Sequence, residues 1–313
     1  MFKEYVLYKI ILLFISVFVM GCGRVPVADY GDDIRIVSLA PNITEAIFAV
    51  GAGNLMVGRT SACNYPAEAE SVAVIGGFGV PSLEMLAKVR PTLVLDSDLA
   101  DEAIGARIDA MGIRRKRVDC SSLDGIPEMM REIGVLTGHE VEGEKIASEI
   151  SVRLAELRSA EVLGTRRVKV YAEVWHDPMT TTGAGTVLSD LIALAGGVNI
   201  GDAARKSYFQ MSPEKVLSAD PDVILCLYMG KNEGAAEALK LRPGWQHLRA
   251  VKNNAVYDGL DNDILLRAGP RILEGVDLLK KCFREHGAGG GEHGIRKSPM
   301  GTNGGGEEGN NVE

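Results

Sequence analysis

The sequence lacks the local patterns that mark many enzymes. It has no GxxxxGKS/T phosphate loop, no HExxH zinc helix and no GxSxG nucleophile elbow. Gly183-Ala184-Gly185 begins like a dinucleotide-binding fingerprint, but the third glycine is missing. Residues of a catalytic triad can also lie scattered along a chain without a local pattern. A surface-anchored hydrolytic enzyme therefore stays open as an alternative, although no motif favours it.

Cysteine and histidine are also too few and too dispersed for a metal site. The five cysteines, Cys22, Cys63, Cys120, Cys226 and Cys282, include no CxxC pair, and the five histidines show no ligand spacing. We therefore expect neither a metal nor a cofactor. Cys226 and Cys282 are expected to be small buried apolar residues. Cys63 and Cys120 could form a disulfide in an oxidising compartment, or remain free.

Positive charge is in deficit, which limits the possible partners. The chain has 34 Lys and Arg against 42 Asp and Glu, giving a formal net charge of −8 and a pI near 5.3. An acidic protein of this kind is a poor match for nucleic acid or for an anionic membrane surface. With 313 residues, 46% of them hydrophobic, the chain can build one large domain or two medium ones.

Residues 1–22 are typical of a secretory signal peptide. Lys3 and Lys9 precede an apolar run, Ile10 to Met20, that is too short to span a bilayer comfortably. The run ends in Val-Met-Gly-Cys, which resembles a bacterial lipobox, so Cys22 is predicted to become the lipidated first residue. The alternative is an uncleaved anchor helix. Both place the mature chain outside the cytoplasm, in the periplasm or on the cell surface, and tethered to a membrane; residues 23–32 would form the tether.

The rest of the chain alternates short β-type runs with helical stretches. This pattern predicts two α/β lobes, residues 33–139 and 165–283, each with a parallel sheet covered by helices. One early strand is expected at Val72–Ile75, and a capping box of Asn42 and Glu45 is expected to begin the first helix. A cleft is expected between the lobes.

One long helix is predicted to join the lobes over residues 140–164. Its apolar residues, at near-helical spacing, are Val141, Ile146, Ile150, Leu154 and Leu157. The tail, residues 284–313, is rich in Gly, Asn and Glu and is predicted to be disordered.

Several stretches resemble the cobalamin- and iron-siderophore-binding family of ABC-importer substrate-binding proteins. They are Arg35–Glu45, Asn64-Tyr65-Pro66, Pro81–Val94, Leu188–Ile200, Met211–Leu217 and Arg267-Ala-Gly-Pro-Arg271, in matching order and spacing across residues 33–283. The resemblance implies the class III periplasmic-binding fold, in which two Rossmann-like α/β lobes are joined by one rigid helix. It also implies a binding protein and not an enzyme.

The resemblance implies capture of cobalamin or a related corrinoid as transported ligand. A ferric siderophore is the close rival, and haem is a weaker one because no axial His or Tyr emerges. The implied partners are an ABC permease dimer with its ATPase, and the protein would act as a monomer. A lobe that feeds a two-component sensor is a further alternative.

The resemblance assigns five residues to the ligand and two to the permease, and the local sequence adds Trp175 to the ligand residues. The ligand residues are Pro41, Tyr65, Phe78, Trp175, Tyr208 and Asp263. Trp175 is favoured because it ends a strand before an Asp-Pro turn, although it could also pack on the lobe surface. Trp245 is expected to pack in the core or on the surface and not to contact the ligand. Glu84 and Glu214 would each dock onto permease arginines, one from each lobe. Their alternative role is to complement the dipole of the helix each one begins.

Overall fold

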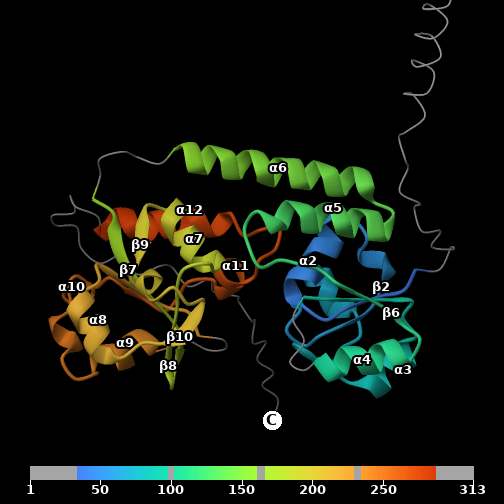
Figure 1. Cartoon of the computed structure of the whole chain (residues 1–313), viewed down its shortest axis with the longest axis horizontal. Coiled ribbons are helices and arrows are strands. Elements are labelled where there is room, and N and C mark those ends of the chain that lie inside the picture. The colour runs from blue at the N-terminus through green and yellow to red at the C-terminus, as the bar shows by residue number, and fades with distance from the viewer. Residues whose placement is uncertain (1–33, 98–101, 161–165, 229–233, 287–313) are drawn as a thin grey trace, which may run out of the picture. The chain divides into compact units, whose positions relative to one another are not determined.

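The computed structural model describes residues 34–97, 102–160, 166–228 and 234–286 of the chain. The predicted signal peptide, the tether and Cys22 lie outside these residues, as does the predicted tail beyond residue 286. Two compact α/β units are present, and each is described by itself (Figure 1).

The division between the units differs from the predicted lobes. Unit 1 holds the described parts of Met1–Glu161 together with Gly185–Leu191 and Asp261–Gly275; unit 2 holds those of Val162–Ala184, Ile192–Leu260 and Val276–Glu313. Residues 185–191 and 261–275, expected in the C-terminal lobe, are thus part of unit 1. For the second segment the reason is electrostatic, because Arg267 and Arg271 pair with the buried carboxylate of Glu45.

The sheet of unit 1 has four parallel strands in the order β2-β1-β5-β6, as the βαβ alternation predicts. These strands are β1 (Ile36–Ser38), β2 (Met56–Arg59), β5 (Leu93–Asp96) and β6 (Arg114–Arg117). The strand expected at Val72–Ile75 is not formed; Val74 makes only an isolated bridge with Arg59. A separate hairpin pairs β3 (Gly76–Gly77) with β4 (Val80–Pro81).

The helices of unit 1 follow its strands. They are α2 (Pro41–Ala49), α3 (Leu83–Val89), α4 (Glu102–Ala110), α5 (Gly125–Thr137), α6 (Glu140–Ser159) and α11 (Asn262–Leu266), with 3-10 turns η1 (Gly53–Leu55) and η2 (Ala67–Ser71). The division between units falls within α7 (Val187–Leu194) and near the start of α12 (Glu274–His286).

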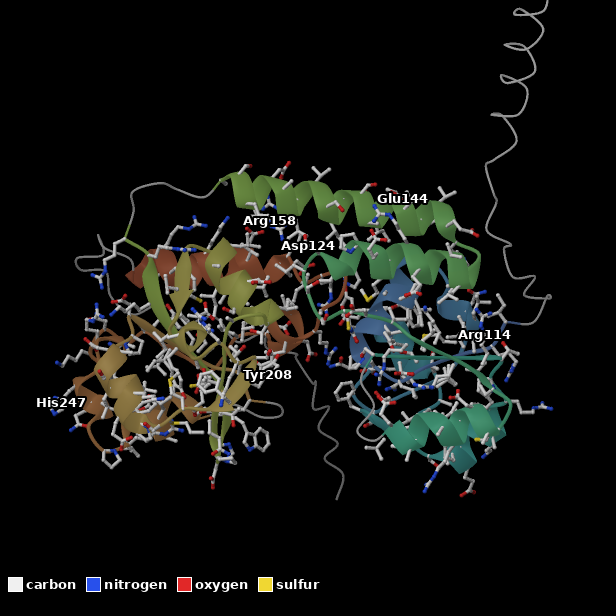
Figure 2. All side chains as sticks on the ribbon, viewed as in Figure 1. Arg114, Asp124, Glu144, Arg158, Tyr208 and His247 are labelled. Carbon is white, nitrogen blue, oxygen red and sulfur yellow. The ribbon has the colours of Figure 1, made fainter. Side chains whose placement is uncertain are left out.

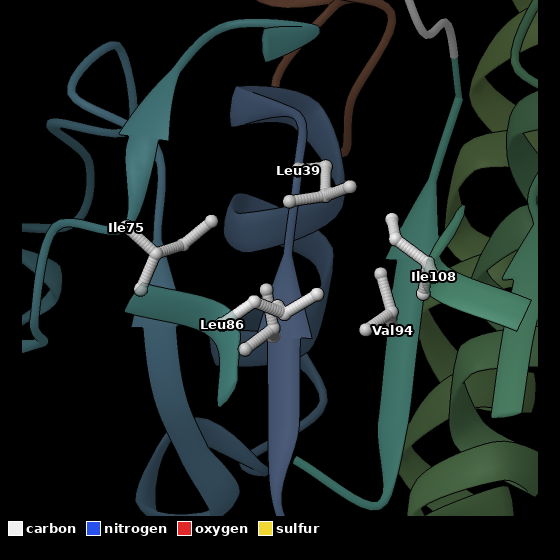
Figure 3. Close-up of a cluster of buried hydrophobic side chains, with 6 residues drawn as sticks. Leu39, Ile75, Leu86, Val94 and Ile108 are labelled. Carbon is white, nitrogen blue, oxygen red and sulfur yellow. The ribbon is translucent and has the colours of Figure 1, made fainter. Parts of the chain in front are cut away.

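Apolar side chains from strands and helices form the core on one face of this sheet. Figure 3 shows the cluster, in which every residue is at most 1% exposed. Its members are Val37, Leu39, Ile75, Leu86, Val94 and Ile108. Burying such side chains stabilises the fold by about 1.5–3 kcal/mol each. This core fixes α3, and with it the position of Glu84.

The long helix α6 packs on the shorter helix α5, which lies beside part of its length (Figure 1). Its buried stripe is Gly143, Ala147, Ile150, Leu154 and Leu157, whereas Val141, expected on that stripe, is 77% exposed. The helices approach closely where a Cβ on Gly143 would lie 3.0 Å from the Cα of Gly134. At the other end Arg158 donates to both carboxylate oxygens of Asp124, at 2.8 and 2.9 Å (Figure 2). Because both ends are held, α6 is fixed to unit 1.

The edge strand β6 consists of four basic residues, and nearby acidic side chains form ion pairs with three of them. Asp96, fully buried at the end of β5, accepts from Arg115 at 2.9 Å and from Arg117 at 3.3 Å. Lys116 pairs with Glu132 at 2.6 Å. Arg115, Lys116 and Arg117 thus have acidic partners within unit 1. Charged side chains on an edge strand also discourage pairing with another sheet edge.

Unit 2 has a mixed sheet in place of the expected parallel one. The order is β10-β8-β7-β11-β12, and β9 pairs with the first residues of β7. The strands β8 and β10 are antiparallel to their neighbours, because the tight turn after β7 returns the chain directly. The bounds are β7 (Val168–His176), β8 (Met179–Thr182), β9 (Gly197–Asn199), β10 (Tyr208–Gln210), β11 (Val223–Cys226) and β12 (Val256–Tyr257).

Short helices complete unit 2. They are α8 (Pro213–Ala219), α9 (Ala235–Lys240) and α10 (Arg249–Lys252), with 3-10 turns η3 (Ile200–Ala204) and η4 (Trp245–His247). Trp245 is fully buried in the core, and its ring packs edge-on against Tyr171 with 6.0 Å between centroids. Helix α12 continues to His286, three residues beyond the predicted end at Phe283.

None of the four described cysteines forms a disulfide with another of them. The Sγ of Cys63 lies 3.1 Å from the hydroxyl of Thr60, and the Sγ of Cys120 accepts from the amide of Asn42 at 2.9 Å, so the alternative of a Cys63–Cys120 disulfide is not formed. Cys226 and Cys282 are buried as expected. Burial raises the pKa of Cys226 to about 12 and that of Cys282 to about 11, which leaves both as unreactive thiols.

Candidate ligand-binding site

Exposed aromatic rings are rare in this protein, and they coincide with the predicted ligand residues. Among the described Phe, Trp and Tyr side chains, only Tyr65, Phe78, Trp175 and Tyr208 are exposed, by 43%, 42%, 41% and 61%. Two of these rings belong to unit 1 and two to unit 2. Exposed apolar rings cost free energy in water, so their restriction to these positions points to contact with a ligand.

In unit 1 the two rings lie on different turns. Phe78 occupies the turn of the β3–β4 hairpin, which Gly79 allows with a φ of 67°. Tyr65 precedes Pro66 through a cis peptide bond. The guanidinium of Arg271 lies over the Tyr65 ring, 3.5 Å from its centroid. One face of Tyr65 is therefore covered by a cation.

A buried carboxylate holds that arginine. Glu45, 3% exposed, accepts from Arg271 at 2.8 and 2.9 Å and from Arg267 at 3.3 Å. The pKa of Arg271 is raised, mainly by its hydrogen bonds to Glu45. The expected capping box is therefore wrong: Ala40 is the N-cap of α2, and Glu45 turns to the arginines instead. A bidentate charge-assisted pair is stronger than the reciprocal cap would be.

The same network engages the predicted ligand residue Asp263. Its carboxylate pairs with Arg267 at 2.7 Å and accepts from the amide of Asn64 at 3.0 Å. Arg267 also donates to the Asn64 side-chain oxygen at 2.7 Å and to the carbonyl of Ala62 at 3.2 Å. Asp263 thus supports the loop that carries Tyr65. Pro41, the remaining predicted residue of unit 1, is buried at the first position of α2.

In unit 2 Trp175 is fixed by its own loop and by neighbouring rings. Its indole N–H donates to the carbonyl of Asp177 at 2.8 Å. The His176 ring lies 5.6 Å from the Trp175 ring and 5.4 Å from the Tyr228 ring, between centroids. These contacts fix the orientation of the Trp175 side chain, although 41% of it is exposed. Tyr208 begins β10 and is marked in Figure 2.

A second buried glutamate organises unit 2. Glu173 accepts from Arg242 at 2.6 and 2.7 Å, from the Tyr171 hydroxyl at 2.9 Å and from the Tyr228 hydroxyl at 2.5 Å. Arg242 in turn lies 4.7 Å from the centroid of the Trp245 ring. Burial and the charge of Glu173 raise the pKa of Tyr171 and of Tyr228, so both hydroxyls remain donors.

Sequence analysis missed both glutamates. Glu45 was assigned to a cap, and Glu173 lies inside a strand with no motif around it. The signal available for Glu45 was Arg267-Ala-Gly-Pro-Arg271, which has two arginines close together. Arginines that are partly buried need acidic partners.

Glu84 and Glu214 occupy equivalent positions in a repeated element. Helices α3 and α8, and strands β5 and β11, are related by a constant offset of 130 residues, 83 to 213 and 93 to 223. Each helix ends in a left-handed residue with a φ of 45°, Arg90 or Asp220. Both glutamates are exposed, are second in their helix, and have no ion-pair partner among the described residues. Hydrogen bonds from its own N–H and from Ser212 lower the pKa of Glu214, which keeps it charged.

The described parts of the chain hold neither a metal-binding cluster nor a membrane-spanning helix. No group of three or more His, Cys, Asp and Glu side chains could hold a metal ion there. No described helix is both long and apolar enough to cross a membrane.

Comparison with known proteins identifies the family to which this chain belongs. The family model described as periplasmic binding protein matches residues 36–262. The chain belongs to the periplasmic binding protein family. The family assignment confirms the recognition made from the sequence motifs, and it identifies the chain as a binding protein and not an enzyme.

Individual relatives agree with this assignment. The chain is 31% identical over 256 residues to the uncharacterized ABC transporter substrate-binding lipoprotein YvrC of Bacillus subtilis, covering 80% of this chain and 79% of YvrC. It is 28% identical over 240 residues to the vitamin B12-binding protein of Salmonella choleraesuis, covering 76% and 86%.

Solved structures confirm the fold class. The periplasmic haem-binding protein RhuT of Roseiflexus in apo form matches with a TM-score of 0.74 and 30% identity, over 81% of this chain and 99% of RhuT. The vitamin B12-binding protein BtuF of Vibrio cholerae matches with a TM-score of 0.69 and 25% identity, over 80% and 96%. The fold is therefore the α/β class III periplasmic-binding fold.

Proposed function

We propose that this chain is the substrate-binding protein of an ABC importer, and that it captures cobalamin or a related corrinoid. The observation that carries the proposal is the restriction of exposed aromatic rings to Tyr65, Phe78, Trp175 and Tyr208. A corrinoid is a broad ring with amide arms, which needs apolar faces together with hydrogen-bonding groups. The vitamin B12-binding proteins among the relatives support this ligand.

Haem is the second candidate, and a specific likeness favours it. The periplasmic haem-binding protein RhuT is 30% identical to this chain. Haem is also a flat macrocycle, so the same exposed rings would serve it. A ferric siderophore is the third candidate for the transported ligand. All three would be transported ligands, so the protein itself would need no cofactor.

Visible absorption separates these ligands. The purified protein is incubated with cyanocobalamin, haemin or a ferric hydroxamate siderophore and passed through a desalting column. We expect a stoichiometric cyanocobalamin spectrum in the retained protein. A haemin band alone would move the assignment to the second candidate, and retention of none of the three would contradict the proposed function.

Removing an exposed ring should weaken binding. Phe78→Ala and Tyr208→Ala should each lower the affinity for cyanocobalamin about 10- to 100-fold, since each deletes an aromatic contact of about 1.5–3 kcal/mol. Leu241→Ala is the matched control, because Leu241 is 85% exposed in unit 2 outside the aromatic set. Isothermal titration measures the affinities. Unchanged affinity in both aromatic variants would remove these rings from the site.

A role in an ABC importer implies a location outside the cytoplasm and a permease as the partner of this protein. We propose that Cys22 carries the lipid, that the mature monomer lies in the periplasm or on the cell surface, and that Glu84 and Glu214 dock it on the permease dimer, whose ATPase drives release. YvrC is named a lipoprotein, which supports the anchor. Cys22→Ser should move the protein from the membrane fraction to the soluble fraction, as followed by immunoblot. A variant that stays with the membrane would contradict the lipid anchor.

A further inference from the structure

The orientation of the Tyr65 ring, a predicted ligand contact, depends on a chain of charged groups. Its exposed fraction is 43%, and Arg271 covers one face at 3.5 Å from the centroid. A cation at this distance is attracted to the ring face. The opposite face is then the one available for stacking against a flat ligand.

Arg271 does not hold this position alone. Two nitrogens of its guanidinium donate to the two oxygens of Glu45, at 2.8 and 2.9 Å, and this fork fixes the guanidinium plane. Glu45 itself is buried to 3% exposure within α2, so its carboxylate cannot follow a displaced arginine. The position of the Tyr65 ring is therefore coupled to a residue that is inaccessible to ligand.

The loop that carries Tyr65 is held from a second direction. Arg267 donates to Asn64 at 2.7 Å, to the Ala62 carbonyl at 3.2 Å and to Glu45 at 3.3 Å. Glu45 is thus the shared acceptor of both arginines. Neutralising it would loosen the ring and the loop together.

We propose that Glu45 is a positioning residue for ligand capture: acting through Arg271, it holds Tyr65 with a single face open for stacking. This inference rests on the proposed function and deepens it. Pre-orienting a contact residue raises affinity because less rotational freedom is lost when the ligand binds.

A double-mutant cycle tests the coupling. Glu45→Gln keeps the size of the side chain and removes its charge. With cyanocobalamin as probe, it should lower the affinity of the full-length protein about tenfold, a change of about 1.4 kcal/mol in binding free energy. In the Tyr65→Ala background the same substitution should change the affinity less than about twofold, because the ring it positions is absent.

Two further variants separate positioning from general stability. Tyr65→Phe keeps the ring and its attraction to Arg271, so it should bind normally and remain sensitive to Glu45→Gln. Asp96→Asn neutralises another buried acid of unit 1 that is paired with two arginines. It should lower the melting temperature measured by circular dichroism and leave the affinity unchanged.

The outcomes are distinct. Loss of affinity by Glu45→Gln to the same extent with and without Tyr65 would overturn the coupling, as would unchanged affinity in Glu45→Gln. Normal binding by Tyr65→Ala would overturn the role of the ring while leaving the proposed function intact. Failure of the unmodified protein to retain any of cyanocobalamin, haemin and the ferric hydroxamate siderophore would instead overturn the proposed function, and this inference with it.

Discussion

Reversing the charge of both Glu84 and Glu214 should abolish uptake of the ligand while leaving its capture intact. The two side chains are exposed, occupy the same position in a repeated helix, and are free of ion pairs within the described residues. If each meets arginines of a permease, Glu84→Arg with Glu214→Arg places like charges together, which costs several kcal/mol per contact. We expect uptake of labelled cyanocobalamin to fall about 100-fold or more, with unchanged affinity in titration.

The alternative role of these glutamates, interaction with the helix dipole, makes a different prediction. It is a local effect of about 0.3–1 kcal/mol on stability, so uptake would persist. The matched control is Glu142→Arg with Glu149→Arg on α6: both residues are exposed, Glu142 also lies in a first helical turn, and the change in net charge is the same. Uptake lost equally in the control pair would contradict a specific docking role.

Single reversals refine the test. Because the element that carries each glutamate is repeated at an offset of 130 residues with the same left-handed end, the two contacts should be of similar strength. Glu84→Arg and Glu214→Arg alone should therefore each reduce uptake by comparable factors. A strong effect of one and none of the other would mean that only one unit docks in this way.

Much of this fold follows from sequence periodicity, and the exceptions have physical causes. Strands β1 and β5 of unit 1 are short apolar runs followed by helices, which is why they are predictable. The strands β8 and β10 are missed because they are polar, with sequences Met-Thr-Thr-Thr and Tyr-Phe-Gln, and owe their pairing to the neighbouring β7. Val141 fails on the α6 stripe because the close approach at Gly143 sets which face is buried.

The candidate site also contains residues that the sequence predicts and residues that it does not. The rings of Tyr65, Phe78 and Tyr208 stand at positions that the family resemblance identifies, and Trp175 ends a strand before an Asp-Pro turn, so a single sequence suffices to nominate them. The buried glutamates cannot be nominated in that way. Glu45 reaches its partner Arg271 across 226 residues of sequence and Glu173 reaches Arg242 across 69, and no local spacing encodes such pairs.

Deleting the second of these carboxylates should give the largest loss of stability. Glu173 is fully buried and accepts four hydrogen bonds, two from Arg242 and one each from Tyr171 and Tyr228. Glu173→Ala leaves a partly buried guanidinium and two hydroxyls without their acceptor. Breaking a buried pair from one side costs about 3–5 kcal/mol, so we expect the free energy of unfolding of unit 2 to fall by that amount.

Tryptophan fluorescence can follow unit 2 selectively, because both tryptophans of the chain, Trp175 and Trp245, belong to it. Urea titration should give a lower midpoint with the same slope, since the slope reports the surface exposed on unfolding. Glu237→Ala is the control: its carboxylate, 77% exposed, pairs with Lys240 three residues along a helix, a contact of at most about 0.5 kcal/mol. A loss of less than about 1 kcal/mol in Glu173→Ala would show that unit 2 does not depend on this network.

Glu173 also holds Tyr228, whose ring packs on His176 beside Trp175. The same substitution should therefore weaken ligand binding even in urea-free buffer, because it disturbs the neighbours that orient the exposed ring of Trp175.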